Sequence, residues 1–249
     1  NSASHSTTPQ DRFFLVDPLD GTREFIKKDG RGSFTVNIAL IEQGEPTLGI
    51  IFVPAFDRLF TGVCGRGAQE QSNGTLRTIM VREAPSTGLL AVASISHRDE
   101  ETDRWLAEHG ITETISIGSS LKFCLVACGE ADVYPRFGPT MEWDTAAGDA
   151  ILRAAGGRVT HPDGSAYTYG KKNYSGVSIT SSKMLSSKLN FMQFRKMQLN
   201  ERIKFGNPSR DLDVDGVVEL AQECFGDLID GCILIGCSLK FLSKQNIRN

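Results

Sequence analysis

The chain has 249 residues, of which 40% are hydrophobic and 23% charged, with a formal net charge of −3. This composition is ordinary for a globular protein with a sizeable core, and the slightly acidic balance argues against nucleic acid as a partner. No apolar run approaches the ~20 residues that a membrane-spanning helix needs, so no membrane span is expected.

The first part of the chain is predicted to form an antiparallel sheet. A short apolar run at residues 12–16 is typical of a buried strand, and a turn is expected over residues 17–22, where Pro18 and Gly21 restrict the backbone. Hairpin-like glycines then separate three further strands, predicted over residues 34–41, 47–53 and 59–63. Strands that follow one another through tight turns favour antiparallel pairing.

From residue 89 the pattern changes to alternating strands and helices. Strands are predicted over residues 90–94, 114–117, 131–135 and 177–180, and helices over residues 99–109, 119–128 and 145–155. We therefore expect an α/β (α+β) fold, in which an antiparallel sheet is layered on a second α/β part. The corresponding halves are residues 1–85 and 86–180.

Residues 181–249 form a predicted C-terminal extension of unknown role. A helix is expected over residues 215–224 and a strand over residues 232–236. The segment 235–241 repeats the segment 117–123 at six of seven positions, with no longer period around it. A local duplication and a misassembled end of the coding sequence both explain the repeat.

The six cysteines indicate the redox compartment. They are scattered, without the paired spacing of a zinc site, and a disulfide framework is not expected in a chain of this size. Free thiols favour a reducing compartment, so we expect a cytoplasmic protein, with an organelle left open.

A short acidic motif, D-P-L-D-G-T at residues 17–22, carries the first chemical signal. Asp17 and Asp20 flank a proline, so their carboxylates and the Leu19 carbonyl can converge on one point, and hard oxygen ligands of this kind suit Mg²⁺. Gly21 and Thr22 follow with backbone N–H groups that favour an anion such as phosphate. The alternative is an ordinary Asp-Gly turn with solvated acids.

A third carboxylate, Asp144, lies far downstream at the start of a predicted Ala-rich helix. It is suited to capping that helix, and capping is compatible with binding a metal. If Asp144 meets Asp17 and Asp20 in the fold, the three carboxylates could complete a two-metal site for displacement at phosphorus.

Several segments carry a resemblance to a known family. Residues 13–25 (FFLVDPLDGTREF) and 143–148 (WDTAAG) resemble the two signature motifs of the inositol-monophosphatase superfamily. The segments FTVNIAL, GSSLKF and YPRFGPT, which begin at residues 34, 118 and 134, resemble its bisphosphate nucleotidase branch, called CysQ. The resemblance covers about residues 12–180 and implies a layered, sugar-phosphatase-like sandwich.

The resemblance implies a lithium-sensitive hydrolysis of 3'-phosphoadenosine 5'-phosphate, a small nucleoside bisphosphate, to AMP and phosphate with two or three Mg²⁺ ions. It implies metal ligation by Asp17, the Leu19 carbonyl, Asp20 and Asp144. Thr22 would orient the attacking water beside the catalytic carboxylates of Asp17 and Asp20, and the amides of Gly21 and Thr22 would contact phosphate. The nucleotide and its second phosphate would be met by His97, Ser119, Lys122 and Arg136.

Other interpretations stay open at these positions. Arg136 is also consistent with an ordinary surface ion pair, and Ser119 and His97 with helix-capping turns. For the whole chain, the alternatives are an inositol or sugar phosphatase of the same superfamily and a catalytically impaired relative that still binds nucleotide.

The chain departs from the family pattern before residue 12. The resemblance implies N-terminal helices and a glutamate that bridges the metals, but only eleven residues precede Arg12 and none is glutamate. We therefore expect these helices to be missing and the coding sequence to be truncated or wrongly started, which leaves the activity of this chain alone open. The acids of the tail lie in surroundings unlike that loop; they are Asp211, Asp213, Asp215 and Glu219.

Overall fold

The computed structural model describes residues 11–26, 32–95, 98–176 and 178–183. They belong to the first of two compact units, Asn1–Leu185; the second, Ser186–Asn249, lies outside the described residues. The helix and strand predicted within residues 215–236, and the second copy of the repeated segment, therefore lie outside them as well.

The first part of the chain forms the expected antiparallel sheet, with six strands in the order β1-β2-β3-β4-β5-β6. The strands are β1 (Arg12–Asp20), β2 (Thr35–Glu42), β3 (Glu45–Val53), β4 (Arg58–Val63), β5 (Gly67–Ser72) and β6 (Thr75–Ile79). The four predicted strands are confirmed. β5 and β6 are not among the predicted strands, because their mostly polar residues lack the apolar runs and clear alternation on which strand prediction depends.

The predicted turn at residues 17–22 is wrong in its first part, because β1 continues to Asp20. Between Asp17 and Asp20 the register with β2 shifts: Asp17 pairs with Asn37, but Asp20 pairs with Thr35. Three steps along β1 thus match two steps along β2, which is the geometry of a bulge. Proline cannot donate a ladder hydrogen bond, and Pro18 is tolerated here because β1 ends the strand order.

The second sheet has five strands in the order β11-β13-β9-β7-β8. Its strands are β7 (Leu90–Ser94), β8 (Glu113–Ile117), β9 (Val133–Arg136), β11 (Gly157–Thr160) and β13 (Ile179–Lys183). β7 pairs in parallel with β8 and β9, whereas β13 pairs antiparallel with β9 and β11, so the sheet is mixed. The prediction missed β11 and the short pair β10 (Thr140–Met141) and β12 (Ser175–Gly176).

Four α-helices accompany these sheets in the described part of the chain: α1 (Thr22–Ile26), α2 (Glu100–Glu108), α3 (Leu121–Ala127) and α4 (Glu142–Ala154). α2 matches its prediction, with Asp99 as the N-cap residue. α3 is shorter than predicted, and α4 begins three residues earlier. No helix among the described residues combines the length and apolar character needed to cross a bilayer.

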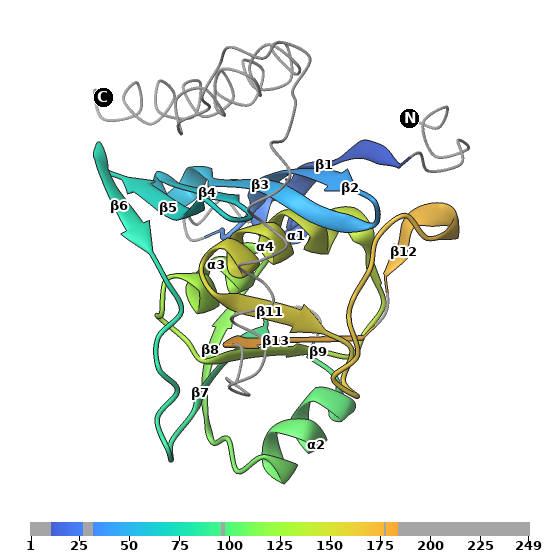
Figure 1. Ribbon diagram of the computed structural model, residues 1–249. Helices are drawn as coiled ribbons and strands as arrows, with labels where there is room; N and C mark the ends of the chain where they lie inside the picture. Colours follow the sequence, from blue (N-terminus) through green and yellow to red (C-terminus); the bar gives the residue numbers. More distant parts are fainter. Residues whose placement is uncertain (1–10, 27–31, 96–97, 177, 184–249) are drawn as a thin grey trace. The chain divides into compact units, whose positions relative to one another are not determined.

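The sheets and helices alternate in layers (Figure 1), and α3 and α4 lie between the two sheets. Along β7, Val92 belongs to the large core beneath α3 and α4, whereas its neighbour Ala91 packs with Leu106 of α2 on the opposite face. Because successive side chains of a strand point to opposite faces, the second sheet carries helices on both sides. The predicted layered α/β fold is confirmed.

Two glycines allow α4 to approach its neighbours closely. A Cβ atom on Gly49 of β3 would collide with the backbone of Ala147, and one on Gly148 of α4 would collide with the Phe123 ring of α3. The small residues of the motif at residues 143–148 thus serve packing, and they hold the start of α4 close to both β3 and α3.

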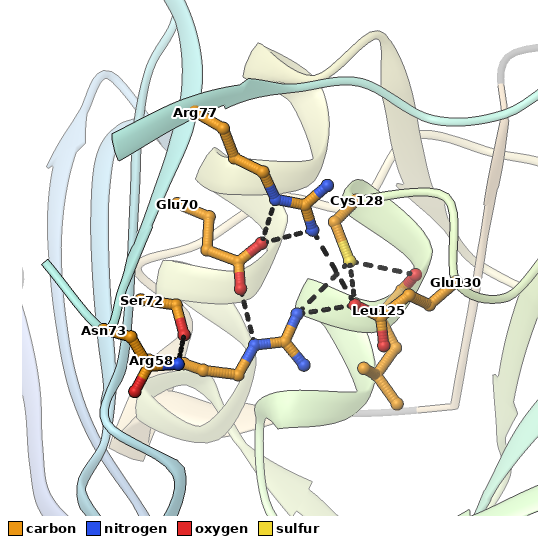
Figure 2. A network of polar contacts seen from close by, with 8 residues as sticks. All are labelled: Arg58, Glu70, Ser72, Asn73, Arg77, Leu125, Cys128 and Glu130. Atoms are coloured by element: carbon orange, nitrogen blue, oxygen red, sulfur yellow. Dashed lines mark hydrogen bonds and ion pairs between the residues drawn. The ribbon is translucent and has the colours of Figure 1, made fainter. Parts of the chain in front are cut away.

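A charged network also ties the helix layer to the antiparallel sheet (Figure 2). Arg58 of β4 donates hydrogen bonds to Glu70 of β5 and to Glu130, which follows α3, both at 2.6 Å. Arg77 of β6 forms a second ion pair with Glu70 at 2.5 Å. These contacts fix the C-terminal end of α3.

Candidate active site

An open cleft of about 330 Å³ lies where β1 leads into α1 and where α3 and α4 begin. The predicted site residues that line it are Asp17, Leu19, Asp20, Gly21, Thr22, Ser119, Lys122, Arg136 and Asp144. His97 lies outside the described residues. Residues from four separate stretches of the sequence thus meet around one cavity.

The bulge in β1 explains how Asp17 and Asp20 meet. Residues three apart on a regular strand point to opposite faces, but the extra residue of the bulge brings both aspartates opposite residues of β2 that share one face. Carboxylate oxygens of these two residues and of Asp144 all lie within 4.8 Å of one another. The three carboxylates therefore form a cluster that could hold a metal ion.

Asp20 is held by several donors that converge on its Oδ2 atom. The backbone amide and the hydroxyl of Ser120 both donate to it at 2.6 Å. Thr35 of β2 adds its hydroxyl at 3.3 Å and Asn37 its side-chain amide at 3.5 Å. The Asp20 side chain is thus fixed from both β2 and the start of α3.

Asp144 lies in the first turn of α4, so the suggestion that it is the N-cap residue is wrong. Its Oδ2 atom accepts hydrogen bonds from the backbone amide of Met141, the actual N-cap residue, at 3.0 Å and from the Thr140 hydroxyl at 2.9 Å. An acidic residue is favoured in a first turn by the helix dipole. The helix begins at Glu142, three residues before its predicted start. The prediction began later because Glu142 and Trp143 do not extend the Ala-rich pattern of the helix.

Burial and the neighbouring carboxylates raise the pKa values of Asp17 and Asp144. Burial, together with the charge of Asp20 and to a smaller extent that of Asp144, raises the pKa of Asp17 to about 7, although a hydrogen bond from the Leu19 amide at 3.0 Å opposes the shift. Burial also raises the pKa of Asp144, and the charge of Asp20 adds to this effect. Such a cluster gains stability from a bound cation.

Two predicted cationic side chains, Lys122 and Arg136, line the same cleft. Lys122 is only 2% exposed; its ammonium group donates to the Ser119 carbonyl at 2.5 Å and lies 5.2 Å from the centre of the Tyr134 ring. Arg136 donates to the Pro139 carbonyl at 2.7 Å, while its buried Nε atom has no hydrogen-bond partner in the structure. The surface ion pair considered for Arg136 is not what the structure records. Both side chains leave donor capacity for an anion.

Ser119 does not cap α3, because Ser120 holds the N-cap position. Ser119 adopts a left-handed conformation with φ of 54°, and its hydroxyl donates to the Ser33 carbonyl. That contact joins the start of α3 to the segment before β2.

On the other wall of the cleft, Thr22 is the first residue of α1. Its hydroxyl donates a hydrogen bond to the Leu19 carbonyl at 3.4 Å. Gly21 has φ of 86°, a conformation that other residues adopt only with strain, and a Cβ atom there would crowd Phe34 and Ser119. Gly21 thereby lets β1 turn abruptly into α1 against the opposite wall of the cleft.

Sequence reasoning missed the residues that support the carboxylates. Ser120, Thr35, Thr140 and Asn37 are noted only as parts of the family segments, without a role. Asn37 carried a usable signal, since it is a lone amide in an otherwise apolar strand core and is 1% exposed. Four further residues line the cleft: Arg23, Glu24, Ser94 and Gly118.

The donor set fits a hard divalent cation. The candidate ligands are carboxylate and carbonyl oxygens, without sulfur or imidazole in the cluster that the described residues form. Oxygen-only sites with waters completing the coordination are typical of Mg²⁺. The raised pKa of Asp17, caused by burial and by the neighbouring carboxylates, agrees with a site for a cation.

Comparison with curated proteins finds CysQ nucleotidases among the relatives of this chain. The chain is 51% identical over 158 residues to a 3'(2'),5'-bisphosphate nucleotidase CysQ from Salmonella typhimurium (strain LT2). The aligned residues cover 64% of this chain and 62% of that protein. The same identity over 148 residues relates it to the CysQ nucleotidase of Escherichia coli (strain K12), covering 59% and 58%. The chain thus spans about 60% of the length of these relatives.

Solved structures and the family profile agree with this relationship. CysQ from Bacteroides thetaiotaomicron, a bacterial member of the inositol monophosphatase family, aligns over 70% of both chains with a TM-score of 0.64 and 42% identity. An inositol monophosphatase from Anabaena aligns over 76% of both chains with a TM-score of 0.59 and 28% identity. Residues 1–191 match the profile of the inositol monophosphatase family, and the chain therefore belongs to that family.

Proposed function

We propose that this chain carries the core of a Mg²⁺-dependent phosphatase that converts 3'-phosphoadenosine 5'-phosphate and water to AMP and phosphate. The observation that carries the proposal is the convergence of three carboxylates and two cationic side chains on one cleft. The 51% identity to CysQ nucleotidases supports this choice of substrate within the family.

In this proposal the acidic half of the cleft holds two or three Mg²⁺ ions through Asp17, the Leu19 carbonyl, Asp20 and Asp144. Bound Mg²⁺ supplies Lewis-acid stabilisation of the negative charge that develops on the transferred phosphate. The residues contribute preorganisation: hydrogen bonds to Asp20 and Asp144 fix their carboxylates before substrate arrives.

The reacting phosphate would lie against the amides of Gly21 and Thr22, beside the metal ligands. A water molecule oriented by Thr22 attacks phosphorus, a new P–O bond forms, and the bond from phosphorus to the ribose 3'-oxygen breaks. The leaving oxygen takes up a proton and becomes the 3'-hydroxyl of AMP. Asp17 and Asp20 contribute to this step as metal ligands that hold the reacting groups at the right distance and orientation.

The basic half of the cleft would recognise the rest of the substrate. Lys122 and Arg136 suit the second phosphate, and a partly unsatisfied arginine is well suited to binding phosphate oxygens. Ser119 and His97 complete the proposed nucleotide contacts. The partner is therefore a small anionic molecule, and we propose a cytoplasmic location because nucleotide substrates of this kind are intracellular.

Phosphate release from three substrates tests the proposal. Purified protein is assayed at saturating Mg²⁺ with 3'-phosphoadenosine 5'-phosphate, inositol 1-phosphate and 3'-AMP, with Asp20→Asn as the inactive reference and with any longer in-frame product of the same gene in parallel. Preference for the bisphosphate over 3'-AMP, together with inhibition by lithium, is the expected result.

Other results would point to the alternatives. Preference for inositol 1-phosphate would identify an inositol phosphatase of the same family. Binding of the bisphosphate without phosphate release, equal for the unaltered protein and Asp20→Asn in every form tested, would identify a catalytically impaired relative.

A further inference from the structure

Ser120 is the residue through which the separate parts of the acidic cluster touch. It holds the N-cap position of α3 and is 2% exposed. Its hydroxyl oxygen lies 2.6 Å from Asp20 Oδ2, at the end of β1, and 2.8 Å from the Asp144 carbonyl oxygen, in the first turn of α4. Three elements from distant parts of the sequence thus meet at one oxygen atom.

The Ser120 hydroxyl both accepts and donates hydrogen bonds. The side-chain amide of Asn37 donates to it at 2.9 Å, so the oxygen accepts one hydrogen bond. Its single hydrogen can be directed to the Asp20 carboxylate or to the Asp144 carbonyl. A small polar network of this kind, when satisfied and buried, holds its members in one arrangement.

The hydrogen bonds to the Asp20 and Asp144 carboxylates determine which of their oxygen atoms can face a metal ion. The recorded donors to Asp20 converge on Oδ2, and those to the Asp144 carboxylate also converge on Oδ2. An oxygen atom that already accepts several hydrogen bonds has few lone pairs left for a cation. The Oδ1 atom of each residue is therefore the better ligand, and its direction depends on how firmly Oδ2 is held.

We infer that Ser120 is a positioning residue for the metal site, in that its hydroxyl sets the spacing between the Asp20 carboxylate and the Asp144 backbone and aims the Asp20 Oδ1 atom at a divalent cation shared with Asp144. The inference rests on the proposed function only for the identity of the site, since it concerns metal binding and not the substrate. Outer partners of metal ligands commonly change metal affinity by about 10–100-fold when they are removed.

The α3 helix gives this hydroxyl a firm base. All seven residues of α3 are buried, and the far end of the helix is fixed by the contacts between Arg58 and Glu130. The backbone amide of Ser120 also donates to Asp20 at 2.6 Å and remains when the side chain is shortened. Replacement by alanine therefore removes the hydroxyl bridge while leaving the helix position and one Asp20 contact in place.

The test compares Ser120→Ala with Ser181→Ala in the full chain. Ser181 is a matched control because it is also buried, and its hydroxyl has no hydrogen-bond partner in the structure. Binding of Mg²⁺ and of Mn²⁺ is measured by calorimetry without substrate, and thermal unfolding is measured in metal-free buffer. Where phosphate release is detected, the Michaelis constant for the bisphosphate is measured at saturating Mg²⁺.

The expected result is a metal dissociation constant about 10-fold higher for Ser120→Ala. The metal-free variant should still unfold in one cooperative transition, at a lower temperature than Ser181→Ala because Asn37 and the Asp144 carbonyl each lose a partner. The Michaelis constant at saturating metal should stay unchanged, because the hydroxyl contacts ligands and not substrate. Metal affinity equal to that of the control overturns the inference, and so does a loss of affinity that is matched by unfolding of the metal-free protein.

The readout separates this inference from the proposed function. If the unaltered protein releases no phosphate from any substrate but Ser120→Ala still weakens metal binding, the positioning role holds and the nucleotidase proposal fails. If phosphate is released but metal affinity does not respond to Ser120→Ala, the proposed function holds and the positioning role fails.

Discussion

Two groups of acidic residues in this protein have opposite surroundings. In the network of Figure 2, Glu70 and Glu130 lie against the guanidinium groups of Arg58 and Arg77. In the cleft, the recorded hydrogen bonds to Asp17, Asp20 and Asp144 come from backbone amides, hydroxyls and a side-chain amide. One group carries its own counterions, and the other has neutral donors only.

The difference appears in the proton affinities of the two groups. Burial alone would raise the pKa of Glu130, but the hydrogen bond and charge of Arg58 outweigh it and leave this pKa lowered. In the cleft, burial and the neighbouring carboxylates raise the pKa of Asp17 to about 7. An acidic cluster whose recorded hydrogen bonds come from neutral donors is therefore better evidence for a metal site than the mere number of acids.

The largest expected effect is on catalysis. Asp20→Asn removes one charge from the cluster, and we expect phosphate release to fall by about 10³-fold, because metal ions supply several kcal/mol of transition-state stabilisation. Initial rates across a Mg²⁺ titration check this. A variant that regains the full rate at high Mg²⁺ would show that Asp20 contributes affinity alone.

The next effect is on stability and concerns the paired group. Glu70→Gln keeps the shape of a buried side chain but leaves the Arg58 charge with one partner fewer, so the free energy of unfolding should fall by about 3 kcal/mol. Urea denaturation measures this change, and calorimetry should find Mg²⁺ affinity unaltered. Weaker Mg²⁺ binding in this variant would contradict the separation of the two groups.

A smaller effect should depend on pH. Hydrogen bonds from Arg82 to Asp132, at 2.6 and 2.7 Å, hold the pKa of Asp132 below its ordinary value despite burial. The pair therefore contributes stability above about pH 4 and loses it as the pH falls through the lowered pKa. Asp132→Asn should cost about 1.5 kcal/mol at pH 7 and progressively less in acid.

Urea denaturation of both proteins at several pH values measures that difference. A gap between Asp132→Asn and the unaltered protein that widens as the pH falls below 4 would contradict the sign of the shift.

The smallest expected effect has the opposite sign. Asp17→Asn relieves the crowding of carboxylates in the metal-free protein, so the free energy of unfolding at pH 8 should rise by about 1 kcal/mol. Thermal unfolding with a chelator present tests this, and adding Mg²⁺ should stabilise the unaltered protein more than the variant. A loss of metal-free stability would show that the hydrogen bond from the Leu19 amide outweighs the crowding of the carboxylates.

Much of the fold could be predicted from residue patterns. The apolar runs of β1 to β4 and the strand–helix alternation after residue 89 predicted most elements, because burial leaves a periodic trace in the sequence. β5, β6 and β11 left a weaker trace, since their residues are largely polar, small or isolated. The bulge in β1 was mistaken for a turn because proline and glycine mark both.

The site was predictable as a set of chemical groups. Asp17, Asp20 and Asp144 were identified by their motifs, and Lys122 and Arg136 by resemblance to a family, and all five line the cleft. The proposed role of His97 remains a prediction, as it lies outside the described residues. Ser120, Thr35 and Thr140 escaped notice because hydroxyl residues are common everywhere and their importance depends on what they face.

The sequence by itself determined the kind of chemistry, since carboxylates around proline and glycine restrict both the ligand type and the backbone. Tertiary structure alone decided how these groups are used. The one-residue shift between β1 and β2 turned two aspartates to one side, and the start of α3 placed Ser120 between Asp20 and Asp144. The contact between Ser120 and Asp20 joins residues 100 positions apart. No local pattern records such a contact, because it results from the packing of whole strands and helices.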